Sequence, residues 1–152
     1  MTGAAQDVAG LIPQAGVARL VESVLELRAD GIDCAGRIPS GHPLVREGCA
    51  PAFLGLEMAA QAAAAFEALR RREHEGQAAP RVGFLVSLRD VRLSMPELPA
   101  GVPLVASIRP LGGAASLALY EVRVLHAGVV VVHGTLGTFM HPADGPAGRD
   151  AE

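Results

Sequence analysis

The stretch GHPLVREGCAPAFLGLEMAAQAAAAFEAL, residues 41–69, decides the fold of this chain. It opens on a loop marked by glycine and proline and continues into an alanine-rich run of high helix propensity. Apolar residues lie on nearly every side of that run, and Glu57 stands among them. A helix that is apolar almost all round must be covered on most sides. We therefore expect one long central helix from Ala52 to about Arg72, ended by Gly76.

The segments before and after this helix have the alternating pattern of β-strands. Val17–Arg28 and Ile32–Ile38 are expected to pair as a hairpin around an Asp-Gly turn signal. Strand-like runs after the helix cover residues 81–98, 103–111, 115–128 and 129–141. Gly112 and Gly113 are expected to form a hairpin turn between two of them. This order predicts an α+β protein of the hot-dog architecture, a curved antiparallel sheet of about six strands wrapped around one long central helix.

The length and charge of the chain bound its organisation and its partners. Its 152 residues suffice for one domain, expected over residues 1–141, and the Pro/Gly/Asp-rich tail 142–152 is expected to be disordered. A formal net charge of −3 argues against nucleic-acid binding, which needs a concentrated basic face. Two carboxylates and an amide in the longest weakly polar run argue against a membrane span.

The cysteine and histidine patterns give no sign of a metal or a nucleophile. Cys34 and Cys49 form no CxxC motif, which favours a reduced, cytoplasmic context. Cys34 is expected in a strand core and Cys49 as a packed or half-exposed thiol rather than a nucleophile. The five histidines lack metal-ligand spacing, so no metal site is expected, and His126 and His133 are expected simply to lie in strands.

Several motifs resemble those of a known enzyme family. PAFLGLEMAAQAA, residues 51–63, resembles the helix start of 3-hydroxyacyl-[acyl-carrier-protein] dehydratases, which reads Pro-Gly, four apolar residues and Glu-x-x-x-Gln-Ala. Gly41–Pro43 resembles the Gly-His-Phe-Pro that carries the family's histidine, and Gly83–Leu93 is similar to the strand after the helix. LIPQAG, from Leu11, is similar to the LIPHAG of predicted hot-dog dehydratases from aryl-polyene and related fatty-acid-like biosynthetic clusters. The resemblance covers about Leu11 to Met140.

The resemblance implies dehydration of a 3-hydroxyacyl thioester to the trans-2-enoyl thioester, without a cofactor. Such a reaction needs a base for the C2 proton, an acid for the departing C3 hydroxyl and donors for the enolate oxygen. A histidine suits the base, and a half-buried carboxylic acid suits the acid because desolvation raises the pKa of such a group. These roles fall to His42 and Glu57, supported by Gln61, with the N–H groups of Ala52 and Phe53 at the helix start as oxyanion donors. In the related enzymes the histidine and the acid come from different subunits of a dimer.

The chain departs from the family pattern around the histidine, and other interpretations of the same residues stay open. The separation of His42 and Glu57 is one residue longer than usual, and Pro43 and Ala52 replace an aromatic residue and a glycine. Glu57 could instead be a buried structural carboxylate paired with Arg89 or Arg92, and His42 a solvated loop residue.

Two other functions use the same fold. The chain could be a hot-dog acyl thioesterase in which Glu57 and Gln61 activate water, or a non-catalytic subunit of a hot-dog heterodimer. Gln61 itself could orient Glu57 or a water, or satisfy a backbone carbonyl.

The expected partners follow from the resemblance. They are an acyl-carrier protein or coenzyme A thioester as substrate and a second hot-dog subunit, identical or different. Carrier proteins are strongly acidic, so arginines near a tunnel mouth would steer them. The candidate docking residues are Arg70, Arg71, Arg81 and Arg89.

Overall fold

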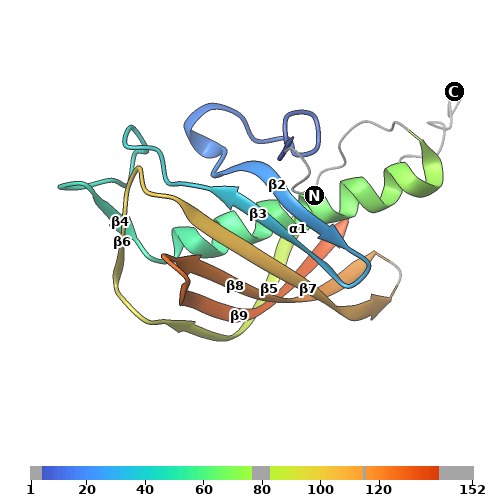
Figure 1. Ribbon diagram of the computed structural model, residues 1–152. Coiled ribbons are helices and arrows are strands. Elements are labelled where there is room, and N and C mark those ends of the chain that lie inside the picture. The colour runs from blue at the N-terminus through green and yellow to red at the C-terminus, as the bar shows by residue number, and fades with distance from the viewer. Residues whose placement is uncertain (1–4, 77–82, 115, 141–152) are drawn as a thin grey trace, which may run out of the picture.

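The computed structural model describes residues 5–76, 83–114 and 116–140 (Figure 1). The elements in chain order are β1 (Gln6–Asp7), the 3-10 helix η1 (Gly16–Ala18), β2 (Val21–Arg28), β3 (Gly31–Gly36), β4 (Cys49–Pro51), α1 (Leu54–Glu75), β5 (Gly83–Leu93), β6 (Glu97–Pro99), β7 (Leu104–Ala114), β8 (Leu117–His126) and β9 (Val129–Met140). Seven strands form one antiparallel sheet in the order β1-β2-β3-β7-β8-β9-β5, and β4 pairs with β6 separately. Figure 1 shows this sheet curving along α1, so the expected hot-dog fold is confirmed.

Helix α1 packs closely on the sheet because much of its surface is alanine. Ala59, Ala62 and Ala65 are fully buried, and the sheet can approach the helix backbone where side chains are this small. At Gly55 the sheet leaves no room for a side chain, since an added Cβ would lie 2.7 Å from a methyl carbon of Val132 on β9. The small residues that make this run a good helix former therefore also set its distance from the sheet.

One side of the helix is not fully covered. Between Leu54 and Leu69 every residue is buried except Glu57, Ala60, Ala64 and Glu67. These positions are three, four and three residues apart, so they form a single line along the helix, which we call the open stripe. The sequence predicted an apolar helix enclosed on most sides, and the structure adds which side stays accessible.

The helix starts later than the sequence predicts. Pro51 does not open α1, because it is the last residue of β4 and pairs with Glu97 of β6. Phe53 is the N-cap and makes no side-chain capping hydrogen bond. The short β4–β6 pair thus holds the chain extended up to Pro51, where local propensity alone favours a helical turn.

Strand β7 is longer than predicted. Gly112 and Gly113 do not form the hairpin turn, because β7 continues to Ala114, which pairs with Leu117. The register shifts between Pro110 and Gly112, so the glycines accommodate an irregularity inside the strand rather than its end.

The remaining predictions about the elements agree with the structure in part. Strand β2 begins at Val21, after the η1 turn, rather than at residue 17. The hairpin between β2 and β3 turns between Arg28 and Gly31, as the Asp-Gly signal predicts. The tail 142–152 lies outside the described residues. No helix in the described part of the chain is long and apolar enough to cross a membrane.

Candidate functional site

A pocket of about 110 Å³ lies along the open stripe. Its walls come from α1, the first residues of β5, the last residues of β9 and the segment after Ile12. The lining residues are Pro13, Gln14, Glu57, Ala60, Ala63, Ala64, Glu67, Gly83, Phe84, Leu85, Thr138 and Met140. Most of them are apolar, and the two carboxylates lie ten positions apart on the helix, a rise of roughly 15 Å. The pocket is therefore narrow and apolar, with a carboxylate toward each end of the stripe.

A hydrogen bond from buried Gln61 holds the Glu57 side chain in place. The Gln61 amide is 1% exposed and fully hydrogen-bonded. Gln61 Oε1 accepts the N–H groups of Leu20 at 2.8 Å and Val21 at 3.3 Å. Gln61 Nε2 donates to the Ala18 carbonyl at 2.7 Å and to Glu57 Oε1 at 3.1 Å. Gln61 thus does both things proposed from the sequence: it satisfies backbone groups and it holds Glu57.

Glu57 is exposed in the single chain, although its neighbours in sequence are apolar. The expected half-buried acid is therefore exposed in the isolated chain, because Glu57 faces the open stripe. In the described part of the chain it forms no ion pair with Arg89 or Arg92, so the structural alternative of a buried ion pair is not supported either. Glu57 stands as an accessible carboxylate at a pocket wall.

His42 lies apart from this pocket in its own chain. It is half-buried in the loop before β4 and does not line the pocket. Its Nδ1 accepts the N–H of Leu44 at 3.1 Å. Because Nδ1 accepts, the neutral ring carries its proton on Nε2 and offers a donor there. A base role for Nε2 would require the Leu44 contact to break, so this geometry suits His42 to donate a hydrogen bond.

The helix start offers fewer free N–H groups than expected. The Ala52 N–H donates to the Pro96 carbonyl at 3.0 Å and is not available to a thioester oxygen. The N–H groups of Gly55 and Leu56 are also paired, with Ala52 and Phe53 carbonyls at 2.9 Å. The oxyanion assignment of Ala52 is thus corrected, because its N–H joins the helix start to the segment before β6.

Two other N–H groups at the start of α1 remain candidates for oxyanion donors. Within the described residues those of Phe53 and Leu54 donate to no backbone carbonyl outside the regular elements. They lie at the positive end of the helix dipole, where a developing oxyanion is stabilised. The sequence pattern pointed to Phe53 but not to Leu54, because the helix starts two residues later than that pattern predicts.

Further polar groups line or adjoin the pocket, and the sequence pattern did not single them out. The Tyr120 hydroxyl donates to Glu67 Oε1, and burial together with this carboxylate raises the pKa of Tyr120. Gln14, in the LIPQAG motif, has its Oε1 buried and without a hydrogen-bond partner among the described atoms. Glu67 could have been found from its position ten residues after Glu57, which returns to the same side of a helix. Tyr120 could not, because its position depends on the sheet.

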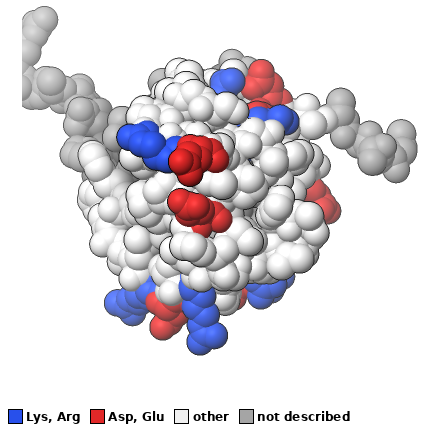
Figure 2. Space-filling model, turned by 90° about the vertical axis from the view of Figure 1, so that its left-hand side faces the viewer, with Lys and Arg blue, Asp and Glu red and all other residues white. Residues whose placement is uncertain are grey.

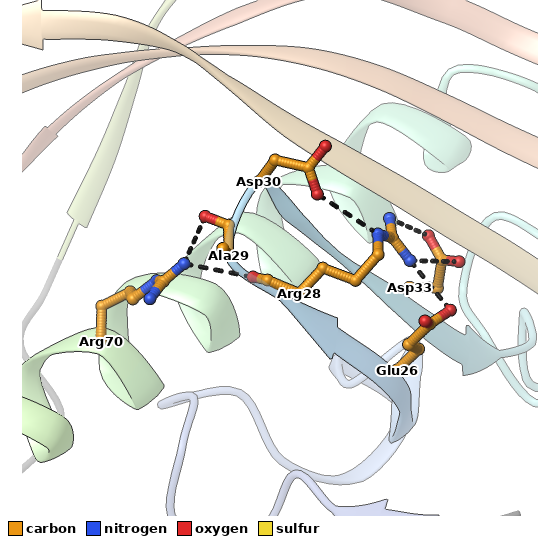
Figure 3. A network of polar contacts seen from close by, with 6 residues as sticks. All are labelled: Glu26, Arg28, Ala29, Asp30, Asp33 and Arg70. Carbon is orange, nitrogen blue, oxygen red and sulfur yellow. Dashed lines mark hydrogen bonds and ion pairs between the residues drawn. The ribbon is translucent and has the colours of Figure 1, made fainter.

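Arg70 has a structural role. As Figure 3 shows, it donates to the carbonyls of Arg28 and Ala29 and so ties α1 to the β2–β3 turn. It also forms an ion pair with Glu73 at 3.2 Å and lies 5.0 Å from the centre of the Phe66 ring. These contacts engage most of its donors, so the structure gives Arg70 a reason to be present other than docking.

The other proposed docking arginines differ from Arg70. Arg71 is half-buried, and Arg81 lies outside the described residues. Arg89 is exposed on β5 and forms no ion pair within the described residues. Among those that the structure describes, Arg89 is exposed and its surroundings leave its charge available to a partner.

The two cysteines occupy the places expected of them. Cys34 is fully buried in β3, and burial raises the pKa of its thiol to about 12. Cys49 is half-buried in β4. Among the described residues no group of three or more His, Cys, Asp or Glu side chains is arranged to hold a metal ion.

The fold has many structural relatives. This chain is similar to a subunit of the dehydratase heterocomplex ApeI:P from Xenorhabdus doucetiae, with 23% identity, a TM-score of 0.80 and coverage of 90% of this chain and 91% of that one. An HP0420 homologue from Helicobacter felis matches at 14% identity and a TM-score of 0.63, covering 95% and 96% of the two chains. The TT0310 protein from Thermus thermophilus matches at 24% identity and a TM-score of 0.56, covering 78% and 90%. At these identities the likeness establishes the fold alone.

Sequence comparison adds the family. Comparison with curated proteins gives no match. The family model described as ApeP-like, ApeP dehydratase, matches residues 6–147, which include the whole helix, the pocket and every described strand. The chain therefore belongs to the ApeP-like dehydratase family.

Proposed function

We propose that this protein dehydrates 3-hydroxyacyl thioesters to trans-2-enoyl thioesters, with Glu57 as the residue that moves protons. The observation that carries the proposal is the accessible Glu57 carboxylate, held by buried Gln61 at the wall of a narrow apolar pocket. Membership of a dehydratase family supports the reaction class. The substrate is an acyl chain on an acyl-carrier protein or coenzyme A, in a fatty-acid-like or polyene pathway.

The chemistry assigns one carboxylate two successive tasks. Glu57 takes the C2 proton, the thioester oxygen becomes an oxyanion, and the N–H groups of Phe53 and Leu54 stabilise it. The C3–O bond then breaks, the C2=C3 bond forms, and the hydroxyl leaves as water with the proton that Glu57 returns, while His42 Nε2–H donates a hydrogen bond to the departing oxygen.

A second chain is part of this proposal. The proposed assembly is a hot-dog dimer in which His42 of one subunit approaches Glu57 of the other. Two observations support it: His42 does not line the pocket of its own chain, and Glu57 is exposed there. A partner over the open stripe would exclude water from the pocket, which strengthens every polar interaction inside it.

A non-catalytic role in a heterodimer is the second candidate, because one observation favours it. The Nδ1 of His42 is occupied by the Leu44 N–H, which leaves the histidine without a free acceptor for the C2 proton. In that case the partner subunit would supply the catalytic pair, and this chain would stabilise it.

The test is a thioester assay on the purified protein, alone and with a second hot-dog subunit. A 3-hydroxyacyl thioester is supplied, and both the 2-enoyl product and free thiol are followed. We expect enoyl product, lowered at least about 100-fold in Glu57→Gln, because general acid–base catalysis typically contributes 10²–10⁴-fold. Glu67→Gln is the matched control, with the same change on the same stripe and less than about a tenfold loss.

Two other outcomes of this assay would indicate a different function. Thiol release without enoyl product would replace the proposal with a thioesterase. Activity only after addition of the partner, and undiminished in Glu57→Gln, would establish the non-catalytic role.

A further inference from the structure

The outer face of the sheet, opposite α1, carries two cross-strand rows of polar side chains. In one row Ser107 of β7, Arg123 of β8, His133 of β9 and Arg92 of β5 are direct neighbours. In the next row the neighbours are Arg109, Glu121, Thr135 and Arg89, in the same strand order. Residues directly opposite each other share a face, and the alternate residues Val122, Val132 and Leu136 are buried. We call Arg89, Arg92, Arg109, Arg123 and His133 the arginine face.

This face is cationic on an acidic chain. Counted together with Glu121 and with Asp90 in the β5 bulge, its four arginines give a net charge of +2 before His133 is counted, against −3 for the whole chain. Glu121 pairs with Arg123 at 3.3 Å and approaches His133 at 4.0 Å. Asp33, which follows Ser107 in its row, shares Arg28 with Glu26 and Asp30, so an acidic cluster borders the arginine face on the side of β2 and β3 (Figure 3).

Three of these arginines lack partners within the described residues. Arg89, Arg92 and Arg109 are exposed and form no ion pair there. By contrast, Arg28 and Arg37 elsewhere on the surface pair with carboxylates at 3.0 Å and 2.8 Å. The arginines of this face are not directly opposite one another, but several unpaired positive charges on one face repel each other at longer range, so an external anion would stabilise this arrangement.

Apolar residues border the arginine face. A shallow hollow is lined by Arg92, Leu93, Ser94, Val130, Val131 and His133. Leu93 and Val130 are 41% and 39% exposed, and Val129 beside them is 63% exposed. In Figure 2 several arginine side chains project from the lower edge of the molecule, the level at which Figure 1 shows β8 and β9. The surface therefore combines spread positive charge with a small apolar hollow.

We infer that the arginine face docks an acidic protein, the carrier that delivers the thioester; this inference rests on the proposed function. Four strands span roughly 14 Å and the two rows lie roughly 7 Å apart, dimensions that match one side of an α-helix. An acidic helix with one exposed apolar side chain would set its carboxylates on the arginines and that side chain in the hollow. No single deep cradle among the described residues concentrates the charges, as a lone phosphate of coenzyme A would need.

The test measures binding directly, so that it does not depend on turnover. Fluorescently labelled acyl-carrier protein, with its phosphopantetheine arm, is titrated with the purified protein in its native assembly while anisotropy is followed. The triple variant Arg89→Gln, Arg92→Gln, Arg109→Gln should weaken binding about tenfold or more, the lower range for electrostatic steering. Glu121→Gln, which removes a negative charge from the face, should tighten it. Arg37→Gln, one positive charge lost elsewhere, should leave it unchanged.

Turnover separates this inference from the proposed function. The triple variant should lose about tenfold in kcat/KM on a carrier-bound 3-hydroxyacyl substrate and nothing on the same acyl group attached to pantetheine. Unchanged carrier binding in the triple variant overturns the docking surface even if the enzyme is active. An equal loss of binding to a single-stranded RNA probe, or a loss of partner-subunit assembly, also overturns it. Carrier binding that behaves as expected, with no dehydration of either thioester, refutes the proposed function alone.

Discussion

Replacing Gln61 tests whether one buried amide holds both the fold and the site. Gln61→Met keeps the length and most of the volume of the side chain but removes all four of its hydrogen bonds. Leu20 and Val21 are fully buried, so their N–H groups cannot form hydrogen bonds with water when the Gln61 amide oxygen is lost. Ala18 is exposed, and its carbonyl can be solvated instead.

The magnitude follows from those two buried donors. An unsatisfied buried N–H costs about 1–3 kcal/mol, and the longer Val21 contact, at 3.3 Å, contributes less than the Leu20 contact at 2.8 Å. We expect the free energy of unfolding to fall by about 2–4 kcal/mol. For a domain of this size that corresponds to a decrease in Tm of roughly 5–15 °C.

Urea unfolding followed by circular dichroism at fixed protein concentration measures this change. Glu57→Gln is the matched control, because it alters only the exposed partner of Gln61 and should stay within about 0.5 kcal/mol of the wild type. A Gln61→Met protein as stable as the wild type would refute the reasoning. An equal loss in both variants would place the stabilising contact at Glu57 instead of at β2.

Three further predictions concern other parts of the molecule. Burial raises the pKa of Cys34 from its ordinary value of 9.0 to about 12, so the folded state retains a proton that the unfolded state releases. The associated stability is complete below pH 9 and lost between about pH 9 and pH 12, and urea midpoints across this range should fall less steeply in Cys34→Ala. In the native protein a thiol reagent should modify Cys49 and spare Cys34 until urea unfolds the chain; rapid native labelling at both sites would contradict the burial of β3. Arg70→Ala should lower the free energy of unfolding by about 1–3 kcal/mol through loss of its bonds to Arg28 and Ala29, whereas exposed Arg92→Ala should change it by less than about 0.5 kcal/mol.

The sequence allowed prediction of the fold because the decisive signals are local. An alanine-rich run without β-branched residues forms a helix, and alternating Val, Leu and Ile form strands. The Asp-Gly signal fixed the β2–β3 hairpin for the same reason. The pair Gly112-Gly113 misled because glycines serve turns and strand irregularities equally well, and the choice between them depends on pairing with β8.

The site was less predictable because its key contacts join segments far apart in the chain. The Ala52 N–H donates to the carbonyl of Pro96, forty-four residues later, and no local sequence pattern predicts this hydrogen bond. Arg70 reaches the β2–β3 turn, forty-two residues earlier. Which side of an apolar helix stays open also depends on where the sheet ends, so composition suggested a buried Glu57 where the structure has an exposed one.

The exposure of Glu57 and the form of β5 both bear on the proposed assembly. Among the described strands, β5 lies at the edge of the sheet, and it presents Phe84, Val86 and Leu88 at 53%, 53% and 44% exposure. Exposed apolar residues on an edge strand favour pairing with another chain. Phe84 also lines the pocket that contains Glu57. A subunit that pairs at this edge would cover the apolar side chains and, at the same time, close the wall of the pocket. The desolvated environment that the sequence suggests for Glu57 is then a property of the assembled protein, and catalysis should depend on the concentration at which subunits pair.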